Sequence, residues 1–347
     1  MKTFVCWLSL LGLGMVGDVE ACCAVAPRGV PVVNADQTVI IAWDKERQME
    51  HFIRKASFRS GGESVGFLVP TPGRPQLEES GNEAFPLLAD ITAPKMPAGK
   101  GFSLPIGCAA ASSRYGVASV RVIEQKTVAG FQTVVLAADS GKALVAWLRE
   151  HGYAYTPEAA VWAEPYLAGG WFMTAMKIAK AAEGRLAPAV AASALRISFK
   201  TDRPLFPYRE PDSRVAAKDL GVKDRLLRIY FVAEARYAGS FPSGGTWSGV
   251  PRWSGPLSAG QRGVLLHDLA LPESTGPAKF WLTEFEDHWP YGQAPGDVFF
   301  APAAKQDRLE RQARAAGVLV DPTLALAVGV VLVRPLLRRR KQSGNAQ

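Results

Sequence analysis

Short runs of apolar residues, many alternating with polar ones, recur along this chain and are typical of β-strands. The run at 38–43 predicts a strand, and the run at 64–69 predicts one that is buried on both faces and ends at Pro70. Alternation around Ile197 predicts a strand with one exposed face. Further strands are predicted at 49–58, 117–122, 128–136, 171–178, 195–200, 227–233, 264–271, 280–285 and 298–300.

A few segments carry the signals of helices instead. Asn82 is a candidate cap for a helix at 82–91. The clearest helix follows the capping residue Ser140, because Leu144 and Trp147 begin an apolar face with helical spacing. Further helices are predicted at 156–169 and, as a charged segment, at 305–317. Strands in runs with a few helices indicate an α+β fold with mostly antiparallel sheets.

The first residues have the pattern of a secretory signal peptide. Lys2 precedes an apolar stretch at 4–16 that is too short to span a bilayer. Small residues before Cys22 fit a cleavage site, which predicts a signal peptide at 1–21. Cys22 is also a candidate for lipidation, although the acidic residues just before it favour simple cleavage.

The last residues have the pattern of a membrane anchor. An apolar segment at 318–337 predicts a transmembrane helix, and the basic tail at 338–347 places the C-terminus in the cytoplasm. Asp321 and Pro322 interrupt the segment, so a buried C-terminal helix and a processed sorting signal remain alternatives. We therefore expect a single-pass protein of the cell membrane with its main domain outside the cytoplasm.

Between these ends lies one exported α+β domain at 22–304. Its length would also be enough for two subdomains. The formal net charge of +8 is concentrated in the basic tail. The exported part therefore lacks the basic footprint of a nucleic-acid-binding protein.

Three cysteines remain once the signal peptide is removed. Cys108 can pair with Cys22 or Cys23, and Cys23–Cys108 is the candidate disulfide. Adjacent cysteines rarely bond to each other because the geometry is strained. The cysteine spacing does not match a zinc site, and we predict neither a metal nor a cofactor.

A catalytic constellation is not evident in the sequence. The serine motif of α/β-hydrolases does not occur. His267 and His288 lie near acidic residues and form a loose cluster, but their spacing does not match a known metal motif. The acidic members of this cluster are Asp268, Glu284, Glu286 and Asp287. We therefore predict that these histidines and acids form a solvent-exposed face, and we assign no catalytic residues.

The segment 239–255 is rich in Gly, Ser and Pro and contains Trp247 and Trp253. Two indole rings in such a loop could stack on a ligand such as a glycan, which makes them the candidate ligand loop. The alternative is that both rings fold back over the sheet, since Trp is buried on average.

One set of motifs lies along the exported part, at Cys22-Cys23, 38–44, 66–72, 134–138, 143–148, 151–153, 172–178, 195–208, 282–283 and 297–299. These segments resemble the bacterial "domain of unknown function 2330" family of exported proteins. The resemblance covers residues 22 to about 304, and its motifs are structural rather than catalytic. It implies no established activity, cofactor or site residue.

Two functional hypotheses follow. The first is a membrane-anchored envelope protein whose exported domain is a non-enzymatic binding module for a cell-wall glycan or an envelope protein. The alternative is an envelope hydrolase whose site is assembled from distant residues, with His267 and His288 as candidates.

Overall fold

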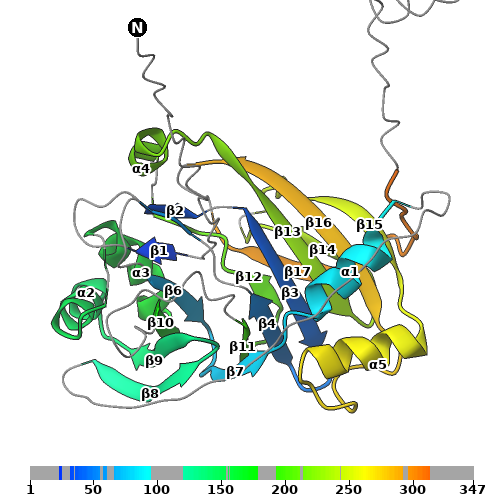
Figure 1. Cartoon of the computed structure of the whole chain (residues 1–347), viewed down its shortest axis with the longest axis horizontal. Helices are drawn as coiled ribbons and strands as arrows, with labels where there is room; N and C mark the ends of the chain where they lie inside the picture. Colours follow the sequence, from blue (N-terminus) through cyan, green and yellow to red (C-terminus); the bar gives the residue numbers. More distant parts are fainter. Residues whose placement is uncertain are drawn as a thin grey trace, which may run out of the picture. The chain divides into compact units, whose positions relative to one another are not determined.

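The centre of the fold is a seven-stranded sheet (Figure 1). The computed structural model describes residues 23–25, 32–34, 36–54, 58–60, 66–94, 120–153, 155, 157–178, 193–211, 214–242, 244–291 and 296–312. Neighbouring strands of the sheet are antiparallel, except β3 and β13, which are parallel. In spatial order its strands are β15 (Val250–Pro256), β16 (Trp281–Pro290), β13 (Asp224–Ala233), β3 (Gln37–Asp44), β4 (Met49–Arg54), β11 (Ala194–Lys200) and β7 (Gln76–Ser80).

A five-stranded antiparallel sheet and two small sheets accompany it. The five strands are, in order, β1 (Cys23–Val25), β6 (Gly66–Thr71), β10 (Phe172–Ile178), β9 (Phe131–Ala137) and β8 (Arg121–Val128). The small sheets are β12 (Leu205–Phe206), β17 (Val298–Pro302) and β14 (Tyr237–Ser240), and the pair β2 (Val32–Asn34) and β5 (Phe58–Ser60).

The largest core lies between these sheets. Val39, Ile41 and Trp43 alternate along β3 and pack with Phe67 of β6 and Phe300 of β17. Because the side-chain period of a strand is two, residues 40 and 42 face the other way and contribute to a second core. The central strands are therefore apolar on both faces, which is why 38–43 is a nearly continuous apolar run.

Helices cover the outer faces of the two large sheets (Figure 1). The seven-stranded sheet is covered by α1 (Ala84–Thr92) and α5 (Ala259–Asp268), and the five-stranded sheet by α2 (Gly141–Glu150) and α3 (Pro157–Ala168). The short α4 (Arg214–Asp219) packs beside Tyr291. The α+β class with mostly antiparallel sheets is confirmed.

Local signals predicted α2 correctly. The Ser140 hydroxyl accepts a hydrogen bond from the backbone N–H of Ala143 at 3.2 Å, and Gly152 has a positive φ of 65° just beyond the helix. For α1 the predicted cap is wrong, because Glu83 occupies the cap position and its side chain does not make a capping bond.

The predicted strand at 264–271 is wrong, because residues 264–268 form the second half of helix α5. Ser258 and Gln261 form a capping box at its start, with each side chain bonded to the other residue's backbone N–H. The apolar residues Leu265 and Leu266 face the sheet, and Leu269 follows at the cap. A run of leucines that fits a strand is thus the buried face of a helix.

The predicted exposed face of β11 is also wrong. Arg196 and Ser198 are buried like their apolar neighbours, 5% and 7% exposed, and the C-terminal end of α5 lies over Arg196. Arg196 donates to the carbonyls of Leu269 and Ala270 and forms an ion pair with Glu78 of β7. The buried polar side chains of this strand are therefore hydrogen-bonded to other parts of the protein rather than to solvent.

The ends of the chain bear on the remaining predictions. Residues 305–312 are not helical, which corrects the predicted helix at 305–317 over its described part. The predicted signal peptide, transmembrane helix and basic tail lie outside the described residues. Among the residues that are described, none of the helices is long and apolar enough to cross a membrane. The described residues from Cys23 to Arg311, Pro94 excepted, belong to one compact unit.

Candidate functional site

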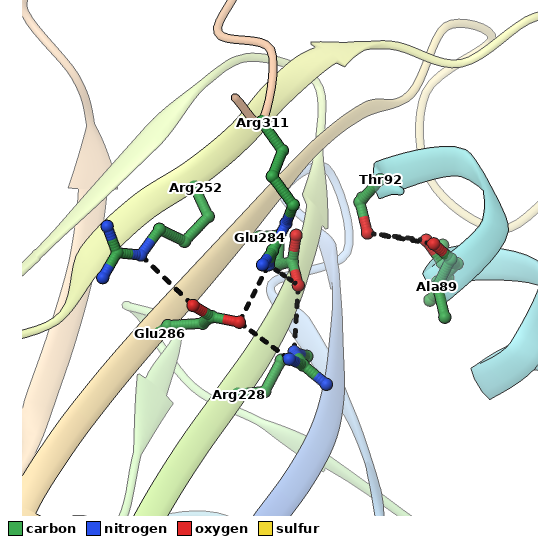
Figure 2. Close-up of polar contacts among 8 residues, drawn as sticks. Ala89, Thr92, Arg228, Arg252, Glu284, Glu286 and Arg311 are labelled. Carbon is green, nitrogen blue, oxygen red and sulfur yellow. Dashed lines mark hydrogen bonds and ion pairs between the residues drawn. The ribbon is translucent and has the colours of Figure 1, made fainter. Parts of the chain in front are cut away.

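Two glutamates on β16 bind three arginines from three other segments (Figure 2). Arg228 of β13 places Nε 2.9 Å from Glu284 Oε1 and Nη2 2.7 Å from Glu286 Oε1. Arg311 contacts the same two carboxylates through Nη2, at 2.6 and 2.8 Å. Arg252 of β15 contacts Glu286 Oε2 at 3.2 Å. We call these five residues the Arg–Glu cluster.

Strand geometry explains why these side chains meet. Glu284 and Glu286 are two residues apart, so both point to the same face of the sheet. Arg228 lies directly opposite Glu286 on the neighbouring strand. On the other side, β15 has an irregularity that gives it one extra residue, Arg252, opposite the step between Phe285 and Glu284, and its side chain reaches Glu286.

The glutamates are buried and the arginines are partly exposed. The side chains of Glu284 and Glu286 are 2% and 9% exposed, against 23–42% for the three arginines. Burial alone raises the pKa of Glu286, but the hydrogen bonds and charges of Arg228 and Arg311 outweigh it and lower the pKa to about 2. Three guanidinium groups facing two carboxylates leave the cluster with one positive charge.

Acid is expected to weaken this cluster. The pKa of Glu286 is lower in the fold than in the unfolded chain, so its stabilisation is present above about pH 4.5 and is lost as the pH falls towards 2. Glu286→Gln should remove about 2–3 kcal/mol of this pH-dependent stability. Urea unfolding of both proteins between pH 5 and pH 2.5 measures it. Parallel pH profiles for the two proteins would contradict the prediction, and Glu234→Gln, at an exposed ion pair with Lys45, is the control.

The histidines of the predicted loose cluster do not join this site. His267 is 88% exposed in its side chain and contacts only its neighbour Asp268, at 3.2 Å, among the described contacts. His288 is exposed on β16. Within the described ranges, no group of three or more His, Cys, Asp or Glu side chains is arranged to hold a metal ion.

In the candidate ligand loop, both tryptophans fold back against the core, which is the alternative that the sequence left open. Trp247 is buried, 4% exposed, and its Nε1 donates to Asp287 Oδ2 at 2.9 Å. A Cβ on Gly239 or Gly249 would lie 2.6 and 2.3 Å from its indole, so these glycines allow the ring to pack. Trp253 is half-buried against the core under α1 and α5. The two rings therefore do not form an exposed stacking platform.

Asp287, another acid of the predicted cluster, lies on the opposite face of β16 from the Arg–Glu cluster. Its Oδ2 accepts from Trp247 and from the hydroxyl of Tyr208, which is 2.7 Å away. Burial raises the pKa of Tyr208, and the charge of Asp287 and the hydrogen bond to it raise it further. Asp287 therefore serves to hold two aromatic side chains in the core.

A second buried ion pair lies close by. Arg225 Nη2 and Glu210 Oε2 are 2.5 Å apart, and the two side chains are 3% and 4% exposed. The guanidinium lies over the rings of Trp289 and Tyr291, 4.1 and 4.8 Å from their centroids. This pair joins the end of the sheet to the segment that follows β12.

One serine and one histidine from distant parts of the chain meet on the sheet. His51 Nδ1 and Ser198 Oγ are 2.8 Å apart. Burial and the charge of Arg196 lower the pKa of His51 to about 4, far below the value that suits a general base at neutral pH. Ser198 also lies inside β11, paired with His51 and Gln76, rather than on a tight turn. The geometry is that of a structural hydrogen bond.

The cysteine predictions fall mostly outside the described residues. Cys22 and Cys108 lie outside them, and Cys23 is the first residue of β1, where it is opposite Leu68. The candidate disulfide and lipidation therefore stay predictions.

Sequence reasoning named the acids of the Arg–Glu cluster but predicted a solvated face, which is wrong because Glu284 and Glu286 are buried. It also missed the arginines. The available signal was Glu284 and Glu286 at strand spacing, since two buried carboxylates on one face require cations. Arg228, Arg252 and Arg311 are 25–58 residues away in the chain, and only the strand order brings them together.

Comparison with known proteins adds a family. No curated protein matches this chain. A solved structure, the crystal structure of baculovirus P35, overlaps 82% of this chain and 98% of that chain with 9% identity and a TM-score of 0.31. That likeness is too loose to carry an argument. The profile described as "Uncharacterized protein conserved in bacteria (DUF2330)" matches residues 18–250, more than half of the chain. The protein therefore belongs to this bacterial family, as the resemblance of its strands and helices predicted.

Proposed function

We propose that this protein is an exported cell-envelope protein, tethered to the membrane by its C-terminal segment, whose α+β domain binds another envelope protein and is not an enzyme. The tether is supported by the sequence, through the signal pattern at 1–21 and the apolar segment at 318–337 with its basic tail.

The non-enzymatic role is inferred from the acidic side chains on β16, which are occupied by structural contacts. Glu284 and Glu286 are held by arginines, and Asp287 is held by two aromatic donors. A carboxylate with a pKa of about 2, as for Glu286, is a poor proton acceptor at neutral pH. The acids that a hydrolase would use therefore maintain the fold.

A protein partner is favoured over a glycan. Glycan stacking would use both indole rings of the candidate loop, and Trp247 is in the core. The seven-stranded sheet ends at β7 and the five-stranded sheet at β8, among the described strands. Such edge strands are surfaces that extended segments of partner proteins can join.

Membrane fractionation tests the tether. After a carbonate wash, the full chain should remain with the membranes and a chain stopped after Gly317 should be released. If both chains are soluble, the C-terminal segment does not anchor the protein. If both stay with the membranes, lipidation of Cys22 replaces the C-terminal tether.

Photo-crosslinking tests the binding role. A photoreactive residue in place of the exposed Glu79 on β7 should crosslink to a protein in the intact envelope. The same residue at the exposed Val161 of α3 is the matched control, with no crosslink expected. Retention on isolated cell-wall glycan without a crosslink would favour the glycan. A stoichiometric metal that is lost in His267→Ala and His288→Ala would favour the hydrolase.

A further inference from the structure

The residues Ala303–Arg311, which we call the strap, run back over the domain after the last strand. The side chain of Gln306 makes two hydrogen bonds to the backbone of Arg236. It accepts from the N–H at 2.8 Å and donates to the carbonyl at 3.0 Å. Leu309 and Ser254 of β15 exchange two backbone hydrogen bonds, both of 2.8 Å. The strap therefore lies against the outer edge of the seven-stranded sheet.

Arg311 fastens the end of the strap. Its Nη2 contacts Glu284 and Glu286 at 2.6 and 2.8 Å (Figure 2). Arg311 lies two residues beyond Leu309, which pairs with Ser254. Both carboxylates also contact Arg228, so each keeps a second cationic partner when Arg311 leaves. The acceptor for the strap is therefore preformed.

Polar contacts, rather than apolar packing, hold the strap in place. Residues 304–308 are exposed, and Leu309 is only partly buried. A segment with few buried apolar contacts can open without unfolding the domain. Its opening therefore requires the loss of polar contacts, which are the bonds between Gln306 and Arg236, the two hydrogen bonds of Leu309 and the ion pairs of Arg311.

The bond between Arg308 and Leu309 has the chemistry that trypsin-like proteases cleave. Arg308 is exposed, whereas the N–H and C=O of Leu309 are occupied by Ser254. A protease binds an extended substrate through such backbone groups, in the manner of an added strand. Leu309 must therefore leave β15 before the bond can be cut.

We propose that the strap is a guarded proteolytic release site, at which a trypsin-like protease cuts between Arg308 and Leu309 once Arg311 has left the glutamates. Water adds across the peptide bond, so that Arg308 gains a carboxylate and Leu309 gains a free amino group. The proposal rests on the proposed tether, because the cut then separates the domain from its anchor. Engagement of Arg311 keeps the domain attached.

Limited trypsin digestion of the full chain in isolated membranes tests this proposal. Cleavage at Arg308–Leu309 is quantified by mass spectrometry of the new ends, and release of the domain by its appearance in the supernatant. Arg311→Ala should speed the cut by roughly ten-fold or more, because cleavage follows the open population and two charge-assisted bonds are lost. Added salt should speed the cut in the natural chain and not in the variant.

Arg252→Ala is the matched control, because it removes an arginine from Glu286 without touching the strap. It should not speed the cut, because Arg311 keeps its contacts with both carboxylates. An unchanged rate in Arg311→Ala would overturn the proposal. So would faster cutting at arginines and lysines throughout the described domain, since Arg311 would then stabilise the whole fold. If Arg311→Ala speeds the cut as expected but the domain is in the supernatant before trypsin is added, the tether is refuted and the guarded cleavage site stands.

Discussion

Replacing Trp247 with Ala is expected to lower the free energy of unfolding by about 3–5 kcal/mol, the range for truncating a large buried aromatic side chain. The indole packs against Phe285 and Phe300 in the core between the sheets, with ring centroids 5.4 and 5.9 Å away. Its loss would also remove one of the two donors to Asp287. Urea unfolding followed by circular dichroism measures the change.

Trp253→Ala is the matched comparison, since it removes the same side chain from a half-buried place in the same segment. We expect a cost of roughly 1–2 kcal/mol, because less apolar area is buried there. If Trp247→Ala proved the milder of the two, the indole of Trp247 would not be a core residue in solution, and the segment 239–255 would return as a ligand loop.

Arg225→Met is expected to cost about 3–5 kcal/mol, the usual penalty for removing one partner of a buried ion pair. Methionine preserves much of the side-chain volume but removes the charge that faces Glu210 and the cation that lies over Trp289. Thermal and urea unfolding at neutral pH measure the loss.

A double-mutant cycle tests the cause of this loss. Glu210→Gln combined with Arg225→Met should cost less than the sum of the single changes, because no charge then loses its partner. Lys45→Met at the exposed pair with Glu234 is the matched surface control, with an expected cost below about 1 kcal/mol. Additive effects at Glu210 and Arg225 would mean that burial, not pairing, sets the energy.

The sequence predicted elements whose signals are local. The strand at 38–43 and the helix after Ser140 formed as expected, because apolar period and capping act within a few residues. Helix α5 was missed because Gly260 and Gly263 weaken its helical propensity, although Ser258 and Gln261 carried the capping signal.

Burial by distant segments could not be predicted in the same way. Arg196 looked like a solvent-facing residue of an alternating strand, and only the position of α5 buries it. The Arg–Glu cluster has the same origin. Glu284 and Glu286 were visible at strand spacing, but the order β15-β16-β13 decides that Arg252 and Arg228 flank them.

The parallel pairing of β3 with β13 has a consequence for the growing chain. The two strands are separated by 180 residues, from Asp44 to Asp224, so at about 5–20 residues per second β3 waits roughly 10–40 s for its neighbour to be synthesised. During that time the hairpin β3–β4 is exposed on the ribosome, although strand β3 is buried on both faces in the finished fold. An exposed apolar segment of this kind is prone to aggregate. A holding chaperone would therefore be most useful where it binds Val39–Trp43.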